Sequence, residues 1–460
     1  MINIQYLVKL LLFTLIIISQ NYLTIQLTRR IETLKPLADY WNVPLDDVPK
    51  LLTIERILSN TTGIVTPLLY QFNDSFGGTY IDVKKNLVFI NTIDFSKEPI
   101  IRSSPKLKDF EHLLKFIPAN YSTHQLESSF NNLSESLNRT NPVNIIMSIS
   151  SFYNRIVIDL YHNDDKDNEA FLNATLPFEQ FIFMNYLSNN NSLSLRSTSD
   201  SQSSRPHTKR FLERYFLAGE GLITNVNGQL AVSCSAGFSA IDNTTFQKYL
   251  IISARCLPNV LNIPIYHALW DEPLPREEEL DHFGHVTLLQ HTSADFALIE
   301  KSYNSHFKLT PMMRNSVGDY QRAIIDKFNN GGFVIPEGHH LCINGYARHN
   351  SCGKVVSNSA NANFKSVREN KKSDTYKYML KADMMALKQD VGGTVYSLEE
   401  PDDGNFVIVV HVIVTHELSR THVTIQLLSE MTKFTKTFNT FARLRFIDLD
   451  VFRQLQQLQH

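Results

Sequence analysis

The chain has few of the residues that mark the most easily recognised classes of protein. Its 460 residues carry a formal net charge of -2 and a pI near 6.8, so it lacks the clustered basic surface that nucleic-acid binding requires. It has only four cysteines, and no two of them form a Cys-x-x-Cys pair, the usual spacing in a structural zinc site. We therefore expect no nucleic-acid partner, no metal and no cofactor.

Long hydrophobic runs are also absent. The apolar stretch from Leu10 to Ile18 follows the positive charge of Lys9 and is too short to span a bilayer. It predicts a signal peptide over residues 1–25, with an uncleaved anchor as the alternative. Asn-x-Ser/Thr sequons are frequent, which fits a protein that passes through a glycosylating pathway; they lie at Asn60, Asn73, Asn120, Asn132, Asn138, Asn173, Asn190 and Asn243. We expect a secreted, extracellular glycoprotein with no membrane contact beyond its signal peptide.

Hydrophobic residues make up 43% of the chain and charged residues 20%, enough apolar side chains to bury a full core. A polar Ser/Asn-rich stretch over 189–213 predicts a linker, because it cannot repay the entropy of its own ordering. The linker contains Lys209-Arg210, which is either a cleavage site for a secretory protease or an ordinary solvated pair of cations. It divides the chain into residues 26–188 and 214–435, followed by 436–460.

The three parts differ in pattern. Residues 26–188 combine helical spacing over 34–58 with strand-like runs such as 155–160, which predicts an α+β region. Residues 214–435 contain many short β-rich runs, which are typical of a barrel or sandwich. The end of the chain is helical in pattern, and we expect 436–460 to form a C-terminal helical extension.

The cysteines fall as two local pairs, Cys234 with Cys256 and Cys342 with Cys352. In a secreted chain an even number of clustered cysteines favours disulfides over a zinc site. Four cysteines allow three pairings, and the spacing alone does not select one.

Five segments resemble the streptogrisin and α-lytic type of serine endopeptidase, within the chymotrypsin and trypsin-like superfamily. They are 234–256 around the first cysteine pair, 293–299 ending in an Asp-Phe-Ala-Leu-Ile run, 342–353 around the second pair, 390–396 with its Gly-Gly-Thr-Val-Tyr run, and 75–82, which is similar to the family's propeptide. The resemblance implies an all-β trypsin-like domain of two antiparallel β-barrels, with the active site between them. It also implies that 26–188 is an α+β pro-region that assists folding.

The same resemblance places this chain's residues at the catalytic positions. Asp295 occupies the position of the triad aspartate, whereas Arg255 stands at the histidine position and Val391 at the serine position. Gln389 replaces a glycine of the oxyanion loop. A guanidinium does not act as a base near neutral pH, and valine has no lone pair with which to attack. We therefore expect a catalytically inactive peptidase homologue that binds a protein or peptide partner and its own pro-region.

The alternative is a serine-type endopeptidase with a displaced active site. Ser293 and Ser397 lie within a few residues of triad positions, and His282, His285 and His291 precede Asp295. A displaced nucleophile has to meet strict geometric limits. For Arg255 we consider two roles, a bidentate pair with Asp295 or a solvent-facing side chain with no partner. Bulky residues in the strand 409–416 are expected to fill the family's substrate pocket.

Overall fold

The computed structural model describes residues 33–187, 215–226, 229–270, 275–291, 294–315, 322–329, 335–366, 372–399, 407–419, 422–427 and 444–457. Several predicted features lie outside the described residues: the signal peptide 1–25, the linker 189–213 with Lys209-Arg210, and the individual residues Asn190 and Ser293.

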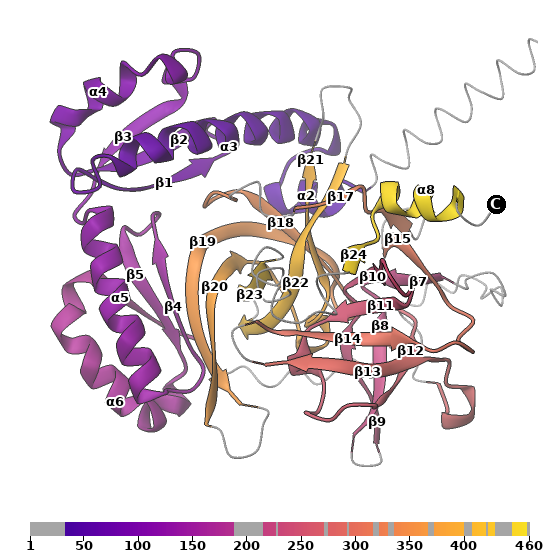
Figure 1. The fold of residues 1–460 in the computed structure, drawn as a ribbon. Helices are drawn as coiled ribbons and strands as arrows, with labels where there is room; N and C mark the ends of the chain where they lie inside the picture. The colour runs from indigo at the N-terminus through magenta and orange to yellow at the C-terminus, as the bar shows by residue number, and fades with distance from the viewer. Residues whose placement is uncertain are drawn as a thin grey trace, which may run out of the picture.

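Residues 33–187 form the α+β region that the sequence predicts (Figure 1). Its helices are α2 (Lys35–Trp41), α3 (Val48–Tyr70), α4 (Glu98–Arg102), α5 (Thr123–Thr140) and α6 (Asp165–Thr175). Its strands are β1 (Phe76–Asp82), β2 (Leu87–Thr92), β3 (Leu114–Pro118), β4 (Ile145–Ser150), β5 (Arg155–Leu160) and β6 (Ile182–Tyr186).

Helix α5 illustrates how local sequence sets an element. Ser122 and Gln125 form a reciprocal capping box at its start, which satisfies two otherwise free N–H groups. The helix ends at Asn141, whose φ of 49° is the left-handed conformation in which asparagine is tolerated. Apolar residues recur every three or four positions on one buried face, at Leu126, Phe130, Leu133 and Leu137.

The remainder is mostly β-structure. Its first strands are β7 (Tyr215–Ala218), β8 (Gly221–Val226), β9 (Gln229–Ser235), β10 (Phe238–Asp242), β11 (Lys248–Ile252), β12 (Pro264–Ala268), β13 (His282–Gln290), β14 (Phe296–Lys301), β15 (Lys308–Arg314), β16 (Arg322–Ile324) and β17 (Lys327–Phe328). The later elements are β18 (His340–Gly345), β19 (His349–Lys365), β20 (Ser373–Asp383), β21 (Thr394–Glu399), β22 (Val407–Ser419), β23 (His422–Leu427), β24 (Leu444–Phe446) and helix α8 (Leu449–Gln457).

The strand pairings confirm a double antiparallel β-barrel domain. In the first half, antiparallel pairs run in the order β24-β10-β11-β14-β13-β12-β8-β9. In the second half, β18-β21-β22-β23-β20-β19 follow one another, and the pairing of β18 with β19 closes the ring. Closure leaves these strands without a free edge.

The predicted C-terminal helix is present as α8. Strand β24 precedes it and pairs with β10 of the first barrel, so part of the stretch 436–460 is extended rather than helical. Pairing with β10 stabilises the extended conformation of β24, because a strand gains its backbone hydrogen bonds only from a neighbouring strand.

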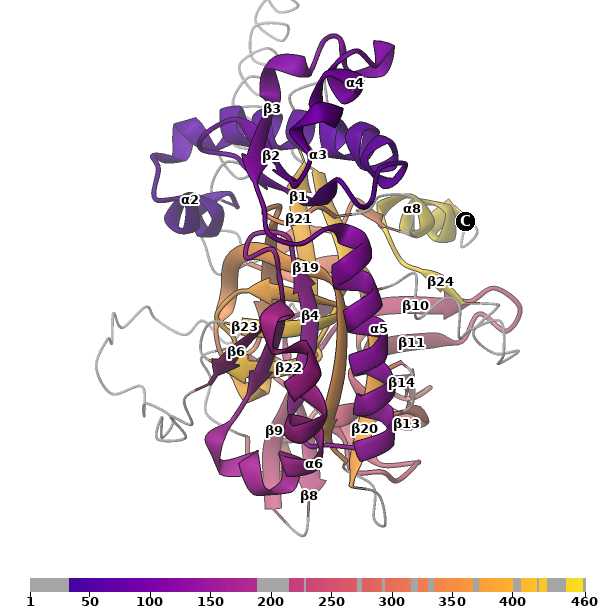
Figure 2. The ribbon, with the colours of Figure 1, turned by 90° about the vertical axis from the view of Figure 1, so that its left-hand side faces the viewer.

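The N-terminal region is joined to the second barrel through a shared sheet. Strand β4 pairs antiparallel with β19, so that β4, β5 and β6 continue the barrel sheet, and α5 and α6 lie on its outer side (Figure 2). Apolar residues of α2 and α3, such as Leu37 and Val65, belong to one buried cluster with Tyr396 and Val410 of the barrel. Separation of the two regions would therefore expose apolar surface on both.

Both cysteine pairs form disulfides, Cys234–Cys256 and Cys342–Cys352. The second joins residues that face each other directly in the β18–β19 register. Among the described residues, no helix combines the length and the apolar composition needed to cross a membrane.

Candidate functional site

Asp295 lies immediately before β14 and is fully buried. Its Oδ2 accepts a hydrogen bond from the Ser253 hydroxyl at 2.5 Å, and its Oδ1 accepts one from the backbone N–H of Arg255 at 3.1 Å. Burial raises the pKa of Asp295 to about 6, although the Arg255 charge and these hydrogen bonds favour the carboxylate. The Ala254 backbone also donates to it, so the carboxyl group is held in place by donors that cannot serve as a catalytic base.

The side chain of Arg255 contacts the β19–β20 hairpin and forms no ion pair with Asp295. Its Nη2 donates to the carbonyl oxygen of Lys365 at 3.2 Å, and the guanidinium carbon lies 4.8 Å from the centre of the Phe364 ring. The predicted bidentate pair with Asp295 is therefore not formed. The solvent-facing alternative is also wrong, because Arg255 is half-buried and hydrogen-bonded. A cation over an aromatic face is itself a favourable contact.

The β19–β20 hairpin supplies the wall beside Asp295. Phe364 and Tyr376 are both fully buried, and burial, together with the Asp295 charge, raises the pKa of Tyr376. Arg255 packs against both aromatic rings. The hairpin thus contributes to the complete burial of Asp295.

Val391 follows the short 3-10 turn η9 (Lys388–Asp390) and is 8% exposed. Its N–H donates to the Lys388 carbonyl oxygen at 3.3 Å, and its carbonyl oxygen accepts the Ser235 N–H at 2.9 Å. The carbonyl oxygen of Gln389 accepts the Ser235 hydroxyl at 2.6 Å. An oxyanion hole requires N–H groups directed at the substrate oxygen, whereas the Val391 N–H is engaged within its own turn.

Neighbouring residues hold this loop firmly. The buried carboxylate of Asp390 accepts N–H groups from Ala347 at 2.7 Å, Arg348 at 3.0 Å and Leu387 at 2.8 Å. The Val391 carbonyl oxygen lies 3.6 Å from Sγ of Cys256, the residue after Arg255. The segment 255–256 therefore contacts both Asp295 and Val391, and the side chains of Arg255, Asp295 and Val391 include no hydroxyl nucleophile and no imidazole base.

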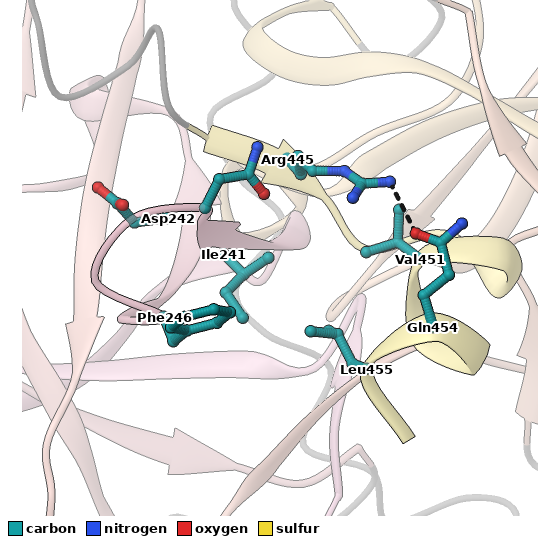
Figure 3. Close-up of a pocket in the computed structure, with 8 residues that line it drawn as sticks. Ile241, Asp242, Phe246, Arg445, Val451, Gln454 and Leu455 are labelled. Carbon is teal, nitrogen blue, oxygen red and sulfur yellow. Dashed lines mark hydrogen bonds between the residues drawn. The ribbon is translucent and has the colours of Figure 1, made fainter. Parts of the chain in front are cut away.

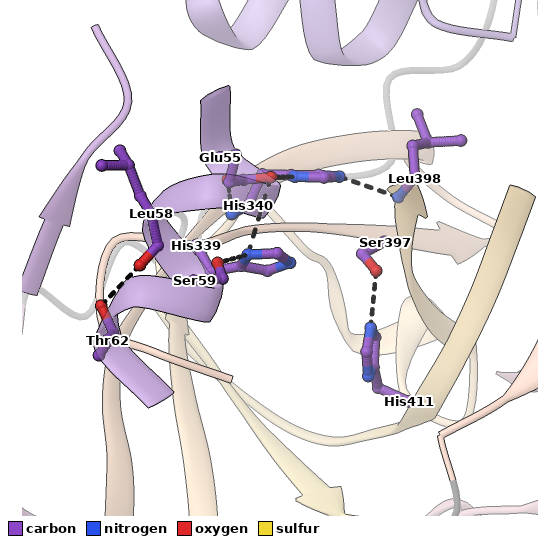
Figure 4. A network of polar contacts seen from close by, with 9 residues as sticks. All are labelled: Glu55, Leu58, Ser59, Thr62, His339, His340, Ser397, Leu398 and His411. Carbon is purple, nitrogen blue, oxygen red and sulfur yellow. Dashed lines mark hydrogen bonds and ion pairs between the residues drawn. The ribbon is translucent and has the colours of Figure 1, made fainter. Parts of the chain in front are cut away.

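Of the alternative nucleophiles, Ser397 has a histidine partner that the sequence analysis did not identify. Its Oγ lies 2.7 Å from Nε2 of His411 (Figure 4). The Asn329 side-chain amide donates to Nδ1 of the same ring at 3.1 Å. Since Nδ1 accepts, the proton of the neutral imidazole is on Nε2 and is donated to Ser397. A general base would have to accept the serine proton. Here the histidine donates to the serine, so the hydrogen bond runs in the wrong direction for catalysis.

The Ser397 pair is also closed to solvent. Ser397 and His411 are 0% and 1% exposed, and burial lowers the pKa of His411 well below its ordinary value. The three histidines named before Asp295 do not replace this partner. His282 is exposed, His285 is half-buried and His291 is buried. Among the described residues, Asp295 accepts its hydrogen bonds from Ser253 and from the backbone at Ala254 and Arg255.

A second buried polar cluster links α3 to the start of β18 (Figure 4). Glu55 accepts the backbone N–H of His340 at 2.7 Å and pairs with Nδ1 of the same residue; its Oε2 lies 3.7 Å from Nδ1 of His339. Burial alone would raise the pKa of Glu55, but the two histidines hold it below its ordinary value. The only sequence signal for this cluster is the adjacent histidine pair.

The Glu55 cluster offers three groups that could hold a metal ion, but its protonation pattern opposes that role. Nε2 of His340 accepts the Leu398 N–H at 2.9 Å, which places the imidazole proton on Nδ1, facing Glu55. A metal ligand at Nδ1 would need that proton removed. The cluster is therefore a hydrogen-bonded contact between the N-terminal region and the barrel.

A cavity of about 290 Å³ lies between the β10–β11 turn and α8 (Figure 3). Its lining combines apolar Phe246, Val451 and Leu455 with Arg445, and Arg445 donates to Gln454 at 3.2 Å. The candidate catalytic positions do not line it.

We expect Arg255→Ala to lower the free energy of unfolding by about 1 kcal/mol, through loss of the aromatic contact and of one hydrogen bond. The effect stays small because the backbone N–H that supports Asp295 is retained. Denaturant unfolding measures it, with Arg453→Ala on the exposed face of α8 as the control. A loss of about 3 kcal/mol or more would instead indicate a buried charge pair.

Comparison with known proteins gives only structural matches. No family model matches the chain, and no curated protein matches it. Among solved structures, Thermobifida fusca protease A is 13% identical with a TM-score of 0.35, and the match covers 50% of this chain and 98% of that one. Cellulomonas bogoriensis chymotrypsin is 14% identical with a TM-score of 0.33, covering 50% and 97%, and an α-lytic protease homologue, N4, is 15% identical with a TM-score of 0.32, covering 47% and 96%.

These structures are chymotrypsin-like serine proteases, the superfamily that the sequence segments resemble. At such low identities they concern the fold alone, and the fold described above rests on the strand pairings of this chain. The role of each site residue rests on its own contacts.

Proposed function

We propose that this chain is a secreted, non-catalytic protein on a trypsin-like serine-peptidase fold, which acts by binding a protein or peptide partner. The observation that carries the proposal is the environment of Asp295. Its hydrogen bonds come from Ser253 and the Arg255 backbone, where catalysis would need an imidazole. Val391 supplies no nucleophile, and loss of triad members removes most of the rate enhancement because they act as a unit.

A displaced serine endopeptidase is the second candidate, favoured by the 2.7 Å contact of Ser397 with His411. The burial of both residues and the direction of their hydrogen bond weigh against it. The peptidase fold is common to both candidates, so only a test of reactivity separates them.

We expect the purified full chain to remain unlabelled by a fluorophosphonate probe under conditions that label an active trypsin-like protease completely. The probe requires a serine activated by a base, and none is available in the crevice. Labelling is followed by gel fluorescence for the natural protein, Ser397→Ala and Ser293→Ala. Labelling of the natural protein that either substitution abolishes would establish the displaced active site and end the non-catalytic proposal.

Secretion and glycosylation are part of the proposal. The described sequon residues are accessible: Asn73 is half-buried, and Asn60, Asn120, Asn132, Asn138, Asn173 and Asn243 are exposed. In a secreting eukaryotic host we expect the protein in the medium, with an N-terminus near residue 26 and a mass that falls on treatment with an N-glycosidase. Intracellular retention, or an unchanged mass, would contradict this part of the proposal.

The N-terminal region is itself a proposed partner of the barrel domain. The shared sheet, the common apolar cluster and the Glu55 contacts support lasting association. In the same secreted preparation, chains cut at Lys209-Arg210 should elute from a sizing column as one species. Elution of two separate pieces would show that the pro-region is released.

A further inference from the structure

Five aromatic side chains form a continuous row across the surface of the N-terminal region. We call Phe89, Tyr80, Phe152, Tyr153 and Phe183 the aromatic row. Successive ring centres are separated by 5.0, 5.4, 5.1 and 5.2 Å in that order. Phe152, Tyr153 and Phe183 are 57%, 53% and 43% exposed. A contiguous exposed apolar patch of this kind marks an interaction surface more often than scattered single residues do.

The row has a fixed geometry. Tyr80 and Phe89 face each other in the β1–β2 register and stack with an interplanar angle of 7°. Phe152 and Tyr153 lie in the β4–β5 turn, whose backbone is held from below by the buried Glu337 carboxylate, which accepts the Phe152 N–H at 3.3 Å. Binding of a partner would therefore cost little side-chain entropy in these rings.

The neighbourhood of the row carries an excess of positive charge. Lys85 lies 5.5 Å from the Phe89 ring centre, and Lys354 lies 5.4 Å from that of Phe152. Lys115 on β3 is exposed and is the register partner of Phe89. Against these lysines stands Asp82, which is already paired with Lys85 at 2.8 Å, and Asp383, the register partner of Lys354. The charge favours an acidic partner.

The ring orientations narrow the choice of partner. Tyr80 and Phe152 meet at 67°, and Phe152 and Tyr153 meet at 89°. The outer pairs, Tyr80–Phe89 and Tyr153–Phe183, are stacked at 7° and 21°, so the row is ridged on either side of Phe152. Edge-to-face rings leave notches that suit proline rings of an extended segment, and a polyproline II segment loses little entropy on binding. A sugar would prefer coplanar ring faces.

We propose that the aromatic row is the docking surface for an acidic, proline-rich segment of a partner protein. This inference rests on the proposed binding function and names its partner's chemistry and its site, which is outside the crevice. The row lies on the N-terminal region, whereas Lys354 belongs to β19 of the barrel domain. The complete surface therefore exists only while the two regions are packed together.

Fluorescence anisotropy with fluorescein-labelled (Glu-Pro-Pro)5 and the full chain tests the proposal. We expect saturable binding that weakens about tenfold or more in Phe152→Ala/Tyr153→Ala, because buried aromatic anchors carry most interface energy. Phe183→Ala, a single exposed change, should weaken binding in the same direction without affecting folding. Lys354→Gln should weaken binding and reduce its salt dependence. Tyr303→Ala removes an isolated ring that is 99% exposed, and it should change nothing.

Four outcomes overturn the inference: no saturable binding by the natural chain, equal loss in Tyr303→Ala, equal affinity for (Lys-Pro-Pro)5, or displacement of the peptide by a soluble glucan oligosaccharide. The fluorophosphonate experiment is independent of all four. An unlabelled chain that does not bind the peptide would leave the non-catalytic proposal standing and remove only the docking surface.

Discussion

Lys381→Ala is expected to lower the free energy of unfolding by about 3–5 kcal/mol, the usual cost of leaving one member of a buried ion pair alone. Lys381 on β20 places its Nζ 2.5 Å from Oδ2 of Asp159 on β5, and the two side chains are 4% and 0% exposed. Among the side chains of the described residues, Asp159 would keep the amide of Asn185, which donates to Oδ1 at 2.7 Å. Because the ion pair joins the barrel hairpin to the N-terminal region, its loss should weaken the contact between these two parts.

The chain offers a matched control for this substitution. Lys327 and Glu399 form an ion pair of similar length, 2.7 Å, but are 53% and 34% exposed, so Lys327→Ala should cost less than about 1 kcal/mol. The double variant Lys381→Met/Asp159→Leu should recover most of the loss, since no charge is left buried. Denaturant unfolding of all three decides the matter. Equal losses for Lys381→Ala and Lys327→Ala would mean that the buried pair does not hold the junction.

Raising the pH from 7 to 9 is expected to destabilise the natural protein through Glu337. This residue is 5% exposed, and its carboxyl group accepts the Ser151 N–H at 2.8 Å. Within the described part of the chain, no cation pairs with it. Burial raises the pKa of Glu337 to about 8 from 4.5, despite these hydrogen bonds. A raised folded-state pKa means that the stabilisation is complete below about pH 4.5 and is lost as the pH rises through about 8. The slope is at most about 1.4 kcal/mol per pH unit.

Other buried titratable groups change the stability of the protein in different pH ranges. The raised pKa of Asp295, about 6, produces its loss of stability at lower pH. The pKa values of Glu55 and His339 are lowered in the folded protein, so the stability that these two groups contribute is lost as the pH falls. The interval from pH 7 to 9 therefore isolates Glu337 among these groups.

Glu337→Gln tests this assignment. The amide mimics the protonated acid, so the variant should keep a nearly constant melting temperature from pH 7 to 9 while the natural protein loses stability. Glu169→Gln, at an exposed position on α6, should retain the natural pH dependence. If Glu337→Gln still loses stability to the same extent, another group is responsible.

Much of the fold follows from local signals. The β-rich runs after residue 214 form the strands of the two barrels. The clustered cysteines predicted disulfides, and the structure then selected the pairing Cys234–Cys256 and Cys342–Cys352 from the three that are possible. A short run of β-forming, apolar residues predicts an extended strand from its own sequence. They do not report which neighbour they pair with, so the joining of β4 to β19 was not predicted.

The contacts around the candidate site were predicted less well, because they depend on residues far apart in sequence. Glu55 and His340 are separated by 285 positions, and Asp159 and Lys381 by 222. Nothing in either local sequence indicates the other partner. The Arg255 side chain was misplaced for the same reason: Phe364 and Lys365, which hold it, lie on a hairpin more than a hundred positions later.

The sequence by itself determined the chemistry available at positions 255 and 391. An arginine cannot become a base near neutral pH and a valine cannot become a nucleophile in any fold, because these limits belong to the side chains themselves. Only the tertiary structure decided where Arg255 points, which way the His411 proton faces, and how firmly the N-terminal region is attached. Those properties arise from packing and hydrogen bonds between distant segments, whose energies exist only after the chain has brought them together.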